Sequence, residues 1–488
     1  MARGKVATTA FAKATVVKKN TRATKAMKPS GVAWLGDIPE GWEIGRVKNS
    51  FYHTKEVVKE RAAEFDRLAL TLQGVIKRPK EDTNGLQPKE FEGYQVLRKN
   101  ELVFKLIDLQ NISTSRVGRS SYDGIVSPAY IILHPRDNSS TAFACYYFLS
   151  MWMHNIFQTL GGDAVRSCLN ASDLLNVPLP LPPLPVQRAI AAYLDDKCGA
   201  IDAAVAEAKK GIEEYKAWKK SLIFEVVTGK RRVGFFNAEK QSRRVAESFS
   251  TGLTRFTGLG ENLDNPVNLV KTKPSGIPWI GDVPVGWKVM KLRRLGIFAN
   301  GISKGGEFFG KGSPFVSYSD VYKNEALPTV VKGRLHSTPE EQEKYSVKKG
   351  DVFFTRTSET IDEIGFASTC MENISQATFA GFLIRFRPTG SEILPSFSKY
   401  YFRNKLVSEY FAKELVMVTR ASLGQELLKS LPVMLPPIPE QRAIADYLDE
   451  KCAAIDAMIA EKEALIAELE AYKKSLIYEV VTGKREVA

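Results

Sequence analysis

The chain has 488 residues, of which 44% are hydrophobic and 25% charged, and its formal net charge is +14. This length is too great for one hydrophobic core and fits two or three domains, and the composition excludes a disordered or membrane-spanning class. The five cysteines show no C-x-x-C spacing, so we expect reduced thiols in a cytoplasmic protein with no membrane contact.

Residues 1–26 are expected to form a basic, disordered tail. Residues 1–30 contain eight basic side chains and no acidic one, which leaves a net charge of only +6 for the rest of the chain. The tail fits either a solvated leader or a non-specific phosphate-binding arm. Net charge alone therefore does not establish nucleic acid as the partner.

Two copies of one unit follow the tail. A lead-in rich in proline, glycine and tryptophan begins at Lys28 and recurs at Lys273, at an offset of 245 residues. A longer match pairs Pro178–Arg231 with Pro432–Arg485 without a gap, at an offset of 254, with 36 identities in 54 positions. The chain is therefore a tandem repeat. The segments between the matched ends diverge, which indicates a shared scaffold with different loops.

Each divergent segment is expected to be an α+β recognition domain. We refer to residues 27–184 as head 1 and to residues 272–438 as head 2, with a linker at residues 231–271. Helices are expected near residues 144–160 and 396–415. Short runs rich in β-branched and aromatic residues predict strands, and these runs are Leu102–Leu106, Tyr130–Leu133, Phe315–Tyr318, Val352–Phe354 and Phe382–Phe386.

A long helix is predicted after each head, at residues 185–230 and 439–485. The proline-rich lead-ins cannot lie inside a helix, and a Thr-Gly pair supplies a glycine stop at the other end of each one. In between, apolar residues recur in steps of four and three, which is the heptad pattern of a coiled coil. The seam residues are Leu194, Ile201, Val205, Ile212 and Leu222 in the first helix and Leu448, Ile455, Ile459, Ile466 and Leu476 in the second.

The obvious partner for each apolar seam is the other helix. The first helix leaves head 1 and the second leaves head 2, so a pair formed between them must be antiparallel. At about 40 residues each, the helices would be about 60 Å long, and the fold would be a pseudo-twofold α+β molecule. The alternative is that each helix packs on a separate partner subunit. Cys198 and Cys452 lie on the seam at equivalent positions, where we expect them to be core residues.

Basic side chains of the heads are the candidate DNA contacts, because arginine binds guanine bidentately and also grips phosphate. Arg166 and Arg420 carry the strongest signal, since the same residue recurs at one scaffold position in two divergent heads. For each of the others, a solvated surface residue is the alternative. The candidates are Lys105, Arg116, Arg119 and Arg166 in head 1 and Arg334, Arg356 and Arg420 in head 2.

No catalytic motif is recognised in the sequence. The run from Gly305 to Lys311 resembles a phosphate-binding loop, but Gly312 stands where that loop needs serine or threonine. The four histidines show neither metal-ligand spacing nor a nucleophile partner. We therefore expect this chain to perform no chemistry and to hold no metal or cofactor.

Two unlike heads, each followed by a proline-led helix, resemble the DNA-specificity subunit of type I restriction–modification systems. The likeness covers nearly the whole chain apart from the tail and the linker. Val186 departs from the pattern, which usually has Glu as at Glu440, and implies a slightly altered helix start. The residues that carry the resemblance are Leu181–Ile190, Leu435–Ile444, the lead-ins Trp34…Gly41-Trp42 and Trp279…Gly286-Trp287, and Lys349–Val352.

The resemblance implies that each head is a target recognition domain for one half of a split double-stranded DNA sequence. It implies that the helices act as a ruler and dock two methyltransferase subunits, which bind S-adenosylmethionine. Two restriction–translocase subunits that use ATP and Mg would complete the complex. The alternative is a coiled-coil scaffold whose heads bind proteins, and salt-dependent DNA affinity in the presence of a methylating partner would distinguish the two functions.

Overall fold

The contacts of the chain divide it into two compact units, residues 1–209 with 463–488 (unit 1) and residues 210–462 (unit 2). Both units combine helices with antiparallel sheets, so the predicted mixed α and β class is confirmed. The basic tail and most of the linker predicted from the sequence fall at residues 1–25 and 234–270, outside the described residues. The computed structural model describes residues 26–82, 90–107, 109, 115–136, 139–160, 168–233, 271–357, 364–414 and 422–487.

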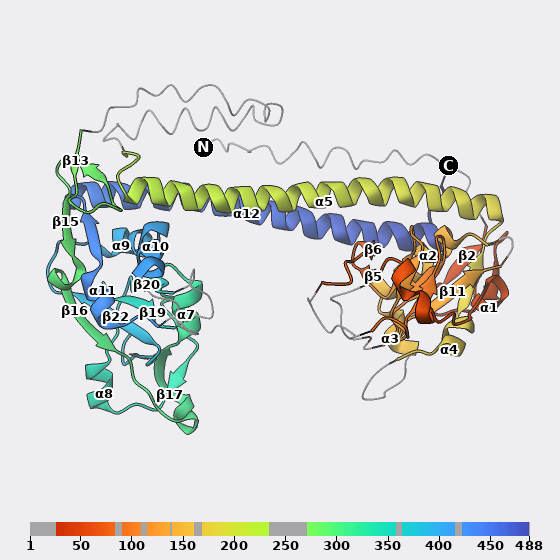
Figure 1. Ribbon diagram of the computed structural model, residues 1–488, viewed down its shortest axis with the longest axis horizontal. Helices are drawn as coiled ribbons and strands as arrows, with labels where there is room; N and C mark the ends of the chain where they lie inside the picture. Colours follow the sequence, from red (N-terminus) through yellow and green to blue (C-terminus); the bar gives the residue numbers. More distant parts are fainter. Residues whose placement is uncertain are drawn as a thin grey trace, which may run out of the picture. The chain divides into compact units, whose positions relative to one another are not determined.

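Head 1 is built mainly from short strands, followed by helices that lead into a long final helix (Figure 1). None of the helices in the described ranges of the chain is long and apolar enough to cross a membrane. The elements in chain order are β1 (Met27–Pro29), β2 (Asp37–Pro39), β3 (Glu43–Arg46), α1 (Val47–Ser50), β4 (Phe51–Tyr52), the 3-10 helix η1 (Lys59–Glu64), β5 (Leu68–Thr71), β6 (Gly74–Lys77), β7 (Gln95–Leu97), β8 (Leu102–Phe104), β9 (Val117–Arg119), β10 (Gly124–Val126), β11 (Ile131–Pro135), α2 (Thr141–Met153), α3 (Ile156–Leu160), α4 (Ala171–Leu175), β12 (Pro178–Leu181) and α5 (Leu184–Val227).

Head 2 begins and ends with corresponding elements and has different elements in its middle. All five expected strands have a counterpart in the two heads, but the one expected at Phe315–Tyr318 runs from Phe309 to Val316, and Tyr318 instead begins helix α7, which Ser317 caps. The elements in chain order are β13 (Thr272–Pro274), β14 (Asp282–Pro284), β15 (Lys288–Lys291), η2 (Leu292–Arg294), β16 (Gly296–Asn300), η3 (Gly306–Phe308), β17 (Phe309–Val316), α7 (Tyr318–Lys323), β18 (Arg334–Leu335), α8 (Pro339–Lys344), β19 (Val352–Thr355), β20 (Ala367–Thr369), β21 (Thr378–Phe379), β22 (Leu383–Pro388), α9 (Pro395–Tyr401), α10 (Lys405–Glu414), α11 (Gln425–Ser430), β23 (Pro432–Leu435) and α12 (Ile438–Val481).

A four-stranded antiparallel sheet of the same topology lies in both heads. The strand order is β4-β11-β8-β9 in head 1 and β16-β22-β19-β20 in head 2. Phe104 pairs with Ile131 in the first sheet, and Phe354 pairs with Ile384 in the second. The central strands of the two heads therefore correspond residue by residue. They are buried on both faces, which explains why their sequences are continuously apolar rather than alternating.

The segments attached to this shared sheet differ between the heads. Head 1 adds the two-stranded pairs β5-β6 and β10-β7, whereas head 2 adds the three-stranded sheet β18-β17-β21. In both heads the entering and leaving strands pair with each other, as β3-β12 and β15-β23. The chain therefore enters and leaves each head at one place, and the variable elements lie between two constant ends.

Each helix expected before the proline lead-in is broken into two. Head 1 has α2 and α3, separated where Asn155 adopts a left-handed φ of 58°. Head 2 has α9 and α10, separated at Asn404, whose side-chain oxygen accepts the backbone N–H of Leu406 at 2.7 Å. Asparagine tolerates left-handed backbone and caps helices with its side chain. The apolar periodicity does not reveal such a break, because it continues through both short helices.

The long helices α5 and α12 have 44 residues each and begin at equivalent positions. The altered start expected from Val186 is therefore wrong. A glutamine fixes each start to its head. The Gln187 amide donates to the Pro182 carbonyl and accepts the N–H of Ser140, and Gln441 makes the corresponding bonds to Pro436 and Leu394. Because these glutamines are buried, their amide groups need such partners.

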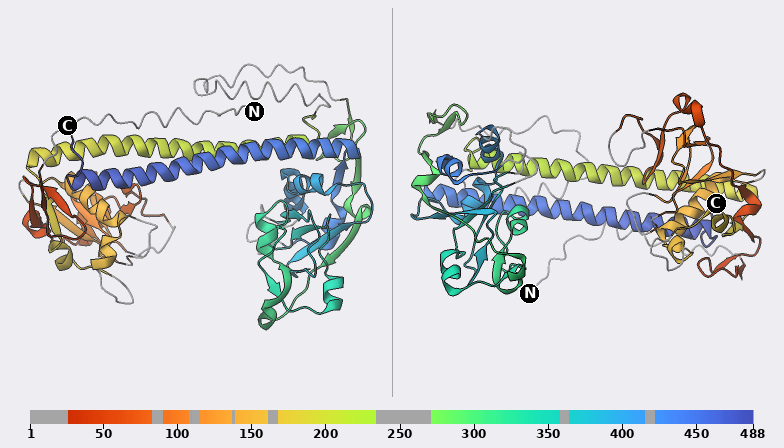
Figure 2. Two further views of the ribbon diagram at one scale, coloured as in Figure 1. Left: turned by 180° about the vertical axis from the view of Figure 1, so that it is seen from behind. Right: turned by 60° about the horizontal axis from the view of Figure 1, so that its bottom comes forward.

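In unit 1 the start of α5 packs against the end of α12. Asp202 accepts the Lys473 ammonium at 2.7 Å, and Lys209 lies 3.6 Å from Glu470. Residue numbers rise along one helix as they fall along the other, so the helices run in opposite directions here (Figure 2). The seam residues Leu194, Ile201, Val205 and Leu476 are buried in one core cluster, and Ile466 packs against it.

In unit 2 the end of α5 packs against the start of α12 through equivalent contacts. Lys219 pairs with Asp456 at 2.8 Å, and these two residues are the repeat counterparts of Lys473 and Asp202. The seam residues Leu222, Leu448 and Ile455 are buried in a second cluster, with Ile459 packed against it, and Ile212 is also buried. Cys198 and Cys452 are buried on the seam, as expected, and all five cysteines are free thiols.

The glycine stops of the long helices pack on the tryptophan lead-ins. Gly229 and Gly483 have left-handed φ values of 72° and 71°. A Cβ on Gly229 would lie 2.5 Å from Pro284 and 3.1 Å from Trp287, and Gly483 meets Pro39 and Trp42 at the same distances. Only glycine satisfies both the conformation and the close approach. The repeated Thr-Gly and Gly-Trp motifs are therefore two sides of one contact, formed once in each unit.

Candidate nucleic-acid interface

Arg116 is not on the surface of head 1. Its side chain is only 1% exposed and its guanidinium donates to the carbonyls of Lys105 and Ile107. A guanidinium buried in this way supports the connection between β8 and β9. We therefore withdraw Arg116 from the DNA contacts predicted from the sequence. Lys105 follows β8 and is half-buried, and it remains a candidate.

Arg119 ends β9 and faces helix α5. Its guanidinium lies 4.0 Å from the carboxylate of Asp195, which also accepts the Tyr146 hydroxyl at 2.7 Å. In unit 2 the equivalent carboxylate of Asp449 accepts Lys399 at 2.6 Å and Tyr400 at 2.5 Å. A tyrosine and a cation thus join each head to its own helix. This contact gives Arg119 a structural role at the joint, whatever else it binds.

Arg334 and Arg356 are attached to two different sheets of head 2, β18-β17-β21 and β16-β22-β19-β20. Arg334 begins β18, and its guanidinium donates to the carbonyls of Val331 and Gly333 at 2.8 and 3.0 Å, so it closes its own turn. Arg356 follows β19 and is half-buried, and its guanidinium has no hydrogen bond or ion pair with any residue that the structure describes. Arg356 therefore keeps its binding capacity for a ligand. Arg166 and Arg420 lie outside the described residues.

A charged pair occupies the same place in both heads, before the central strand. In head 1 the Glu101 carboxylate lies 2.6 Å from Nδ1 of His134, and both side chains are buried. In head 2 the Asp351 carboxylate binds Arg387 through two contacts of 2.6 Å. The acidic residue also accepts the backbone N–H of Arg98 in head 1 and of Lys348 in head 2. The acidic residue and its backbone hydrogen bond are therefore retained in both heads. The basic partner is a histidine in head 1 and an arginine in head 2.

The hydrogen bond to the Glu101 carboxylate raises the pKa of His134 above its ordinary value, against the lowering effect of burial. Raising the pH is therefore expected to destabilise head 1 and not head 2. A histidine with a raised folded pKa stabilises the fold fully below its unfolded value of about 6.5, and this contribution is lost as the pH rises through the folded pKa. Head 2 has an arginine at this place, a residue type that does not lose its proton in proteins.

The measurement is hydrogen-exchange protection of β8 and β11 compared with β19 and β22, between about pH 6 and pH 9, corrected for intrinsic exchange rates. Protection should fall in head 1 only. A His134→Gln variant, which cannot be protonated, should lose the pH dependence. An equal fall in both heads, or none in head 1, would contradict the role of this pair.

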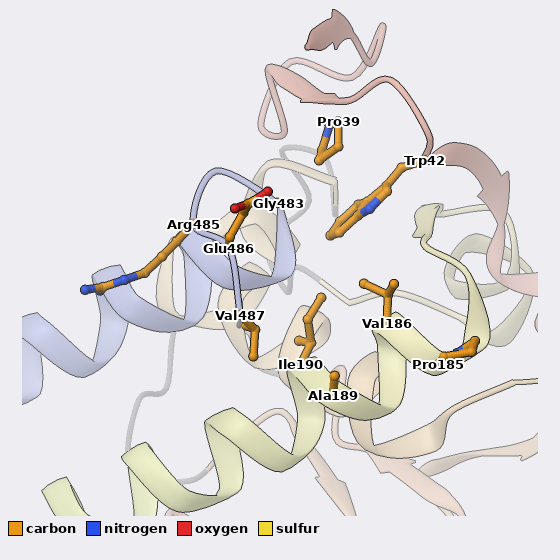
Figure 3. A pocket seen from close by; sticks show the side chains of 10 residues that line it. All are labelled: Pro39, Trp42, Pro185, Val186, Ala189, Ile190, Gly483, Arg485, Glu486 and Val487. Atoms are coloured by element: carbon orange, nitrogen blue, oxygen red, sulfur yellow. The ribbon is translucent and has the colours of Figure 1, made fainter. Parts of the chain in front are cut away.

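A pocket of about 390 Å³ lies in unit 1 between the lead-in, the start of α5 and the end of the chain, with Trp42 and Val186 in its wall (Figure 3). At the equivalent positions of unit 2, Glu440 and Arg232 form an ion pair of 3.8 Å. Unit 1 has Val186 and Glu486 there instead. Both members of the pair have changed together, so Val186 avoids placing two carboxylates side by side.

Two large aromatic side chains are exposed on the long helices, away from the seam. Trp218 of α5 and Tyr472 of α12 are repeat counterparts, and each is 49% exposed. Between residues 217 and 231 the copies differ only at this position and at residue 224, whereas only two of the nine positions 208–216 are identical. The exposed surface around the aromatics is therefore retained. This retention is visible when the two copies are compared in the sequence, whereas the apolar spacing of the seam does not include these exposed positions.

A lysine and a second aromatic complete this surface. In unit 1 the Lys197 ammonium lies 5.8 Å from the centre of the Tyr193 ring, and the pKa of Lys197 is raised mainly by Asp196 and to a smaller degree by Tyr193 and Tyr472. Lys197 also pairs with Asp196 at 3.0 Å. We call Tyr193, Lys197 and Tyr472 the aromatic patch of unit 1. The repeat counterparts in unit 2 are Tyr447, Lys451 and Trp218. There the Lys451 ammonium lies 5.8 Å from the centre of the Tyr447 ring.

A family model and two curated relatives that match this chain all belong to type I restriction enzymes. Residues 71–213 and 284–471 match the family described as the type I restriction modification DNA specificity domain. The chain is 23% identical over 472 residues to the type I restriction enzyme EcoKI specificity subunit of Escherichia coli K12, covering 92% of this chain and 90% of the relative. It is 20% identical over 467 residues to the StySPI specificity subunit of Salmonella potsdam, with the same coverage of 92% and 90%.

A solved structure shares the fold. It comes from work on complex assembly and conformational transition of the type I R-M system, and it superposes with a TM-score of 0.61 at 16% identity. The superposition covers 92% of this chain and 99% of that one. The likeness therefore extends over both heads and both long helices.

Proposed function

Because this chain belongs to the family of the type I restriction modification DNA specificity domain, we propose that it is the non-catalytic subunit that reads a bipartite, asymmetric double-stranded DNA target. Each head would read one half. The observation that carries this proposal is the shared four-stranded sheet with different attached segments in the two heads. One frame that supports two different surfaces suits the reading of two different sequences.

The distribution of charge supports DNA binding by the heads rather than along the helices. Helices α5 and α12 together contain 12 basic and 17 acidic side chains, whereas residues 272–437 contain 22 basic and 16 acidic ones. Phosphate groups are repelled by the former and attracted by the latter. Residues 27–183 contain 18 basic and 17 acidic side chains. DNA binding by head 1 would therefore depend on where its basic side chains lie and not on its net charge.

The long helices are proposed to form a pseudo-twofold antiparallel coiled coil that serves as a ruler and as the docking surface for two methyltransferase subunits. The acidic character of the helices and their retained aromatic patches favour a protein partner there. One patch in each unit matches two copies of one subunit. In this proposal the methyltransferase subunits hold S-adenosylmethionine, two restriction–translocase subunits use ATP and Mg, and this chain holds no cofactor.

Replacing the exposed aromatics is expected to remove these partners one at a time. Exposed tryptophan and tyrosine side chains are frequent hot spots, where truncation to alanine costs about 2 kcal/mol or more, or roughly 30-fold in affinity. Trp218→Ala or Tyr472→Ala should each reduce the number of bound methyltransferase subunits from two to one, and the double variant should bind none. Mass measurement of the purified complex reads this out directly.

A control variant is Lys210→Ala, an exposed helix position whose repeat counterpart is already Ala464. It should leave the stoichiometry unchanged. Full binding by the double variant would show that the aromatic patches are not the docking surface.

The proposed function itself is tested by producing this chain with its methylating partner and mapping the methylated adenines on genomic DNA. We expect methylation within one asymmetric sequence interrupted by an unspecified spacer, and DNA affinity that falls steeply with salt. The partner alone should methylate no defined sequence. Methylation that does not depend on this chain would refute the proposal.

A further inference from the structure

Head 2 holds an exposed phenylalanine at the tip of a rigid turn. Phe382 is 65% exposed, whereas Phe379 and Leu383 on either side are fully buried. The N–H of Leu383 closes the turn on the carbonyl of Ala380 at 3.0 Å. A single exposed apolar side chain is common in proteins, but the backbone that carries Phe382 is fixed by hydrogen bonds and an arginine follows the neighbouring strand.

Three neighbouring segments hold the turn through its backbone. The N–H of Ala380 donates to Val316 at 3.0 Å, and the N–H of Gly381 donates to Ile302 at 2.8 Å. The carbonyl of Phe382 accepts the N–H of Arg356 at 2.9 Å. A Cβ on Gly381 would collide with the Oγ of Ser303, so a larger residue there would force this hydroxyl to move. The phenyl ring is thus presented to solvent from a fixed backbone.

The same turn exists in head 1 without the aromatic residue. There the N–H of Tyr130 donates to the carbonyl of Ser127 at 3.1 Å, and the Gln95 amide donates to the carbonyls of Ser127 and Tyr130. By the strand register, Pro128 and Ala129 occupy the places of Gly381 and Phe382. The heads therefore share the turn and differ in its exposed residue, which is the behaviour expected of a position that reads a different sequence in each head.

Arg356 and Phe382 are adjacent through their backbone hydrogen bond, and the Arg356 guanidinium has no hydrogen bond or ion pair with the residues that the structure describes. We propose that Phe382 and Arg356 form a DNA-binding element in which the phenyl ring contacts a base step and the guanidinium binds a phosphate or guanine. This inference rests on the proposed function of head 2 as a DNA reader.

Physical chemistry favours this ligand. Apolar wedges such as phenylalanine insert between base steps, and aromatic rings also stack on bases. Arginine provides the phosphate or guanine contact beside them. Because the turn is already fixed, binding would order little additional backbone, which leaves more of the interaction free energy for affinity. The excess of basic side chains in head 2 gives DNA the right long-range field.

The test uses the full chain with its methylating partner on DNA that carries the mapped target. Phe382→Ala should weaken binding about 10- to 100-fold, as expected for a lost aromatic–base contact, with an unchanged salt slope. Arg356→Ala should also weaken binding and should lower the salt slope by about one if the guanidinium binds phosphate. Val330→Ala, at a head 2 position that is 77% exposed, is the control and should bind as the unaltered chain does.

A 2-aminopurine base placed along the half-site of head 2 should change its fluorescence on binding, and this change should be absent with Phe382→Ala. Thermal unfolding should be unaffected, because the ring is largely exposed. If the unaltered complex binds its target and Phe382→Ala binds equally well, this inference fails and the proposed function stands. If Phe382→Ala keeps DNA affinity but loses a protein partner, the turn is a protein contact. If the unaltered complex has no specific DNA affinity, both fail.

Discussion

Seven residues inserted into each of α5 and α12 are expected to lengthen the spacer of the DNA target by about three base pairs. The inserted heptad adds about 10.5 Å to each helix at 1.5 Å per residue, and DNA advances about 3.4 Å per base pair. The insertions belong after Lys209 and after Lys462, at the boundary of the two units, so that the contacts inside each unit are left in place. Methylation mapping should show both half-sites unchanged.

Insertions of five residues at the same places are the matched control. A heptad returns the seam to nearly its original face, whereas five residues rotate it by about 140°. The seams of the two units would then no longer lie on the same face of each helix, and residues such as Ile201 or Ile455 would not face the other helix. The five-residue variant should therefore lose stability and DNA binding. The heptad variant should lose some affinity, since a longer spacer also rotates one half-site around the DNA axis. An active heptad variant with the original spacer would refute the ruler.

The helices and the sheets were predictable because their signals are local or repeated. Prolines, a glycine stop and heptads are readable along the chain, and the gapless match of the two copies fixed which residues correspond. The buried central strands appear as short apolar runs. The pairing of Gly229 with Trp287, by contrast, joins two motifs of constant sequence that the sequence does not link. It required the structure, because residues far apart along the chain meet there.

The candidate site was predicted less well. A sequence shows that a residue is an arginine and does not show whether it is buried, so Arg116 could not be separated from Arg356. The sequence predicts a strand that includes Phe382 because Leu383, Ile384 and Phe386 follow it, and only the hydrogen bonds of the turn place it outside β22. The Glu101–His134 pair was missed for the same reason, since its members lie 33 residues apart. Burial and register are tertiary properties, and periodicity does not encode them.

Exchanging one head is expected to change one half of the DNA target and leave the other half as it was. Residues 30–177 contain the variable part of head 1 and also its side of the contacts with the long helices, such as Tyr146 with Asp195 and Trp42 with Gly483, and both of these residues recur in head 2 as Tyr400 and Trp287. A head from another protein of this family should therefore be accepted by the same frame. Since α12 and head 2 are untouched, the half-site read by head 2 should remain.

The most direct test of the central claim is a methylation map of the complex that carries the exchanged head, compared with the map of the unaltered complex. The bases of the half-site read by head 1 should change, whereas the bases of the other half-site and the length of the spacer should stay the same. The reciprocal exchange of head 2 should give the opposite pattern. A map in which both half-sites change together, or in which neither changes, would contradict independent reading of DNA by the two heads.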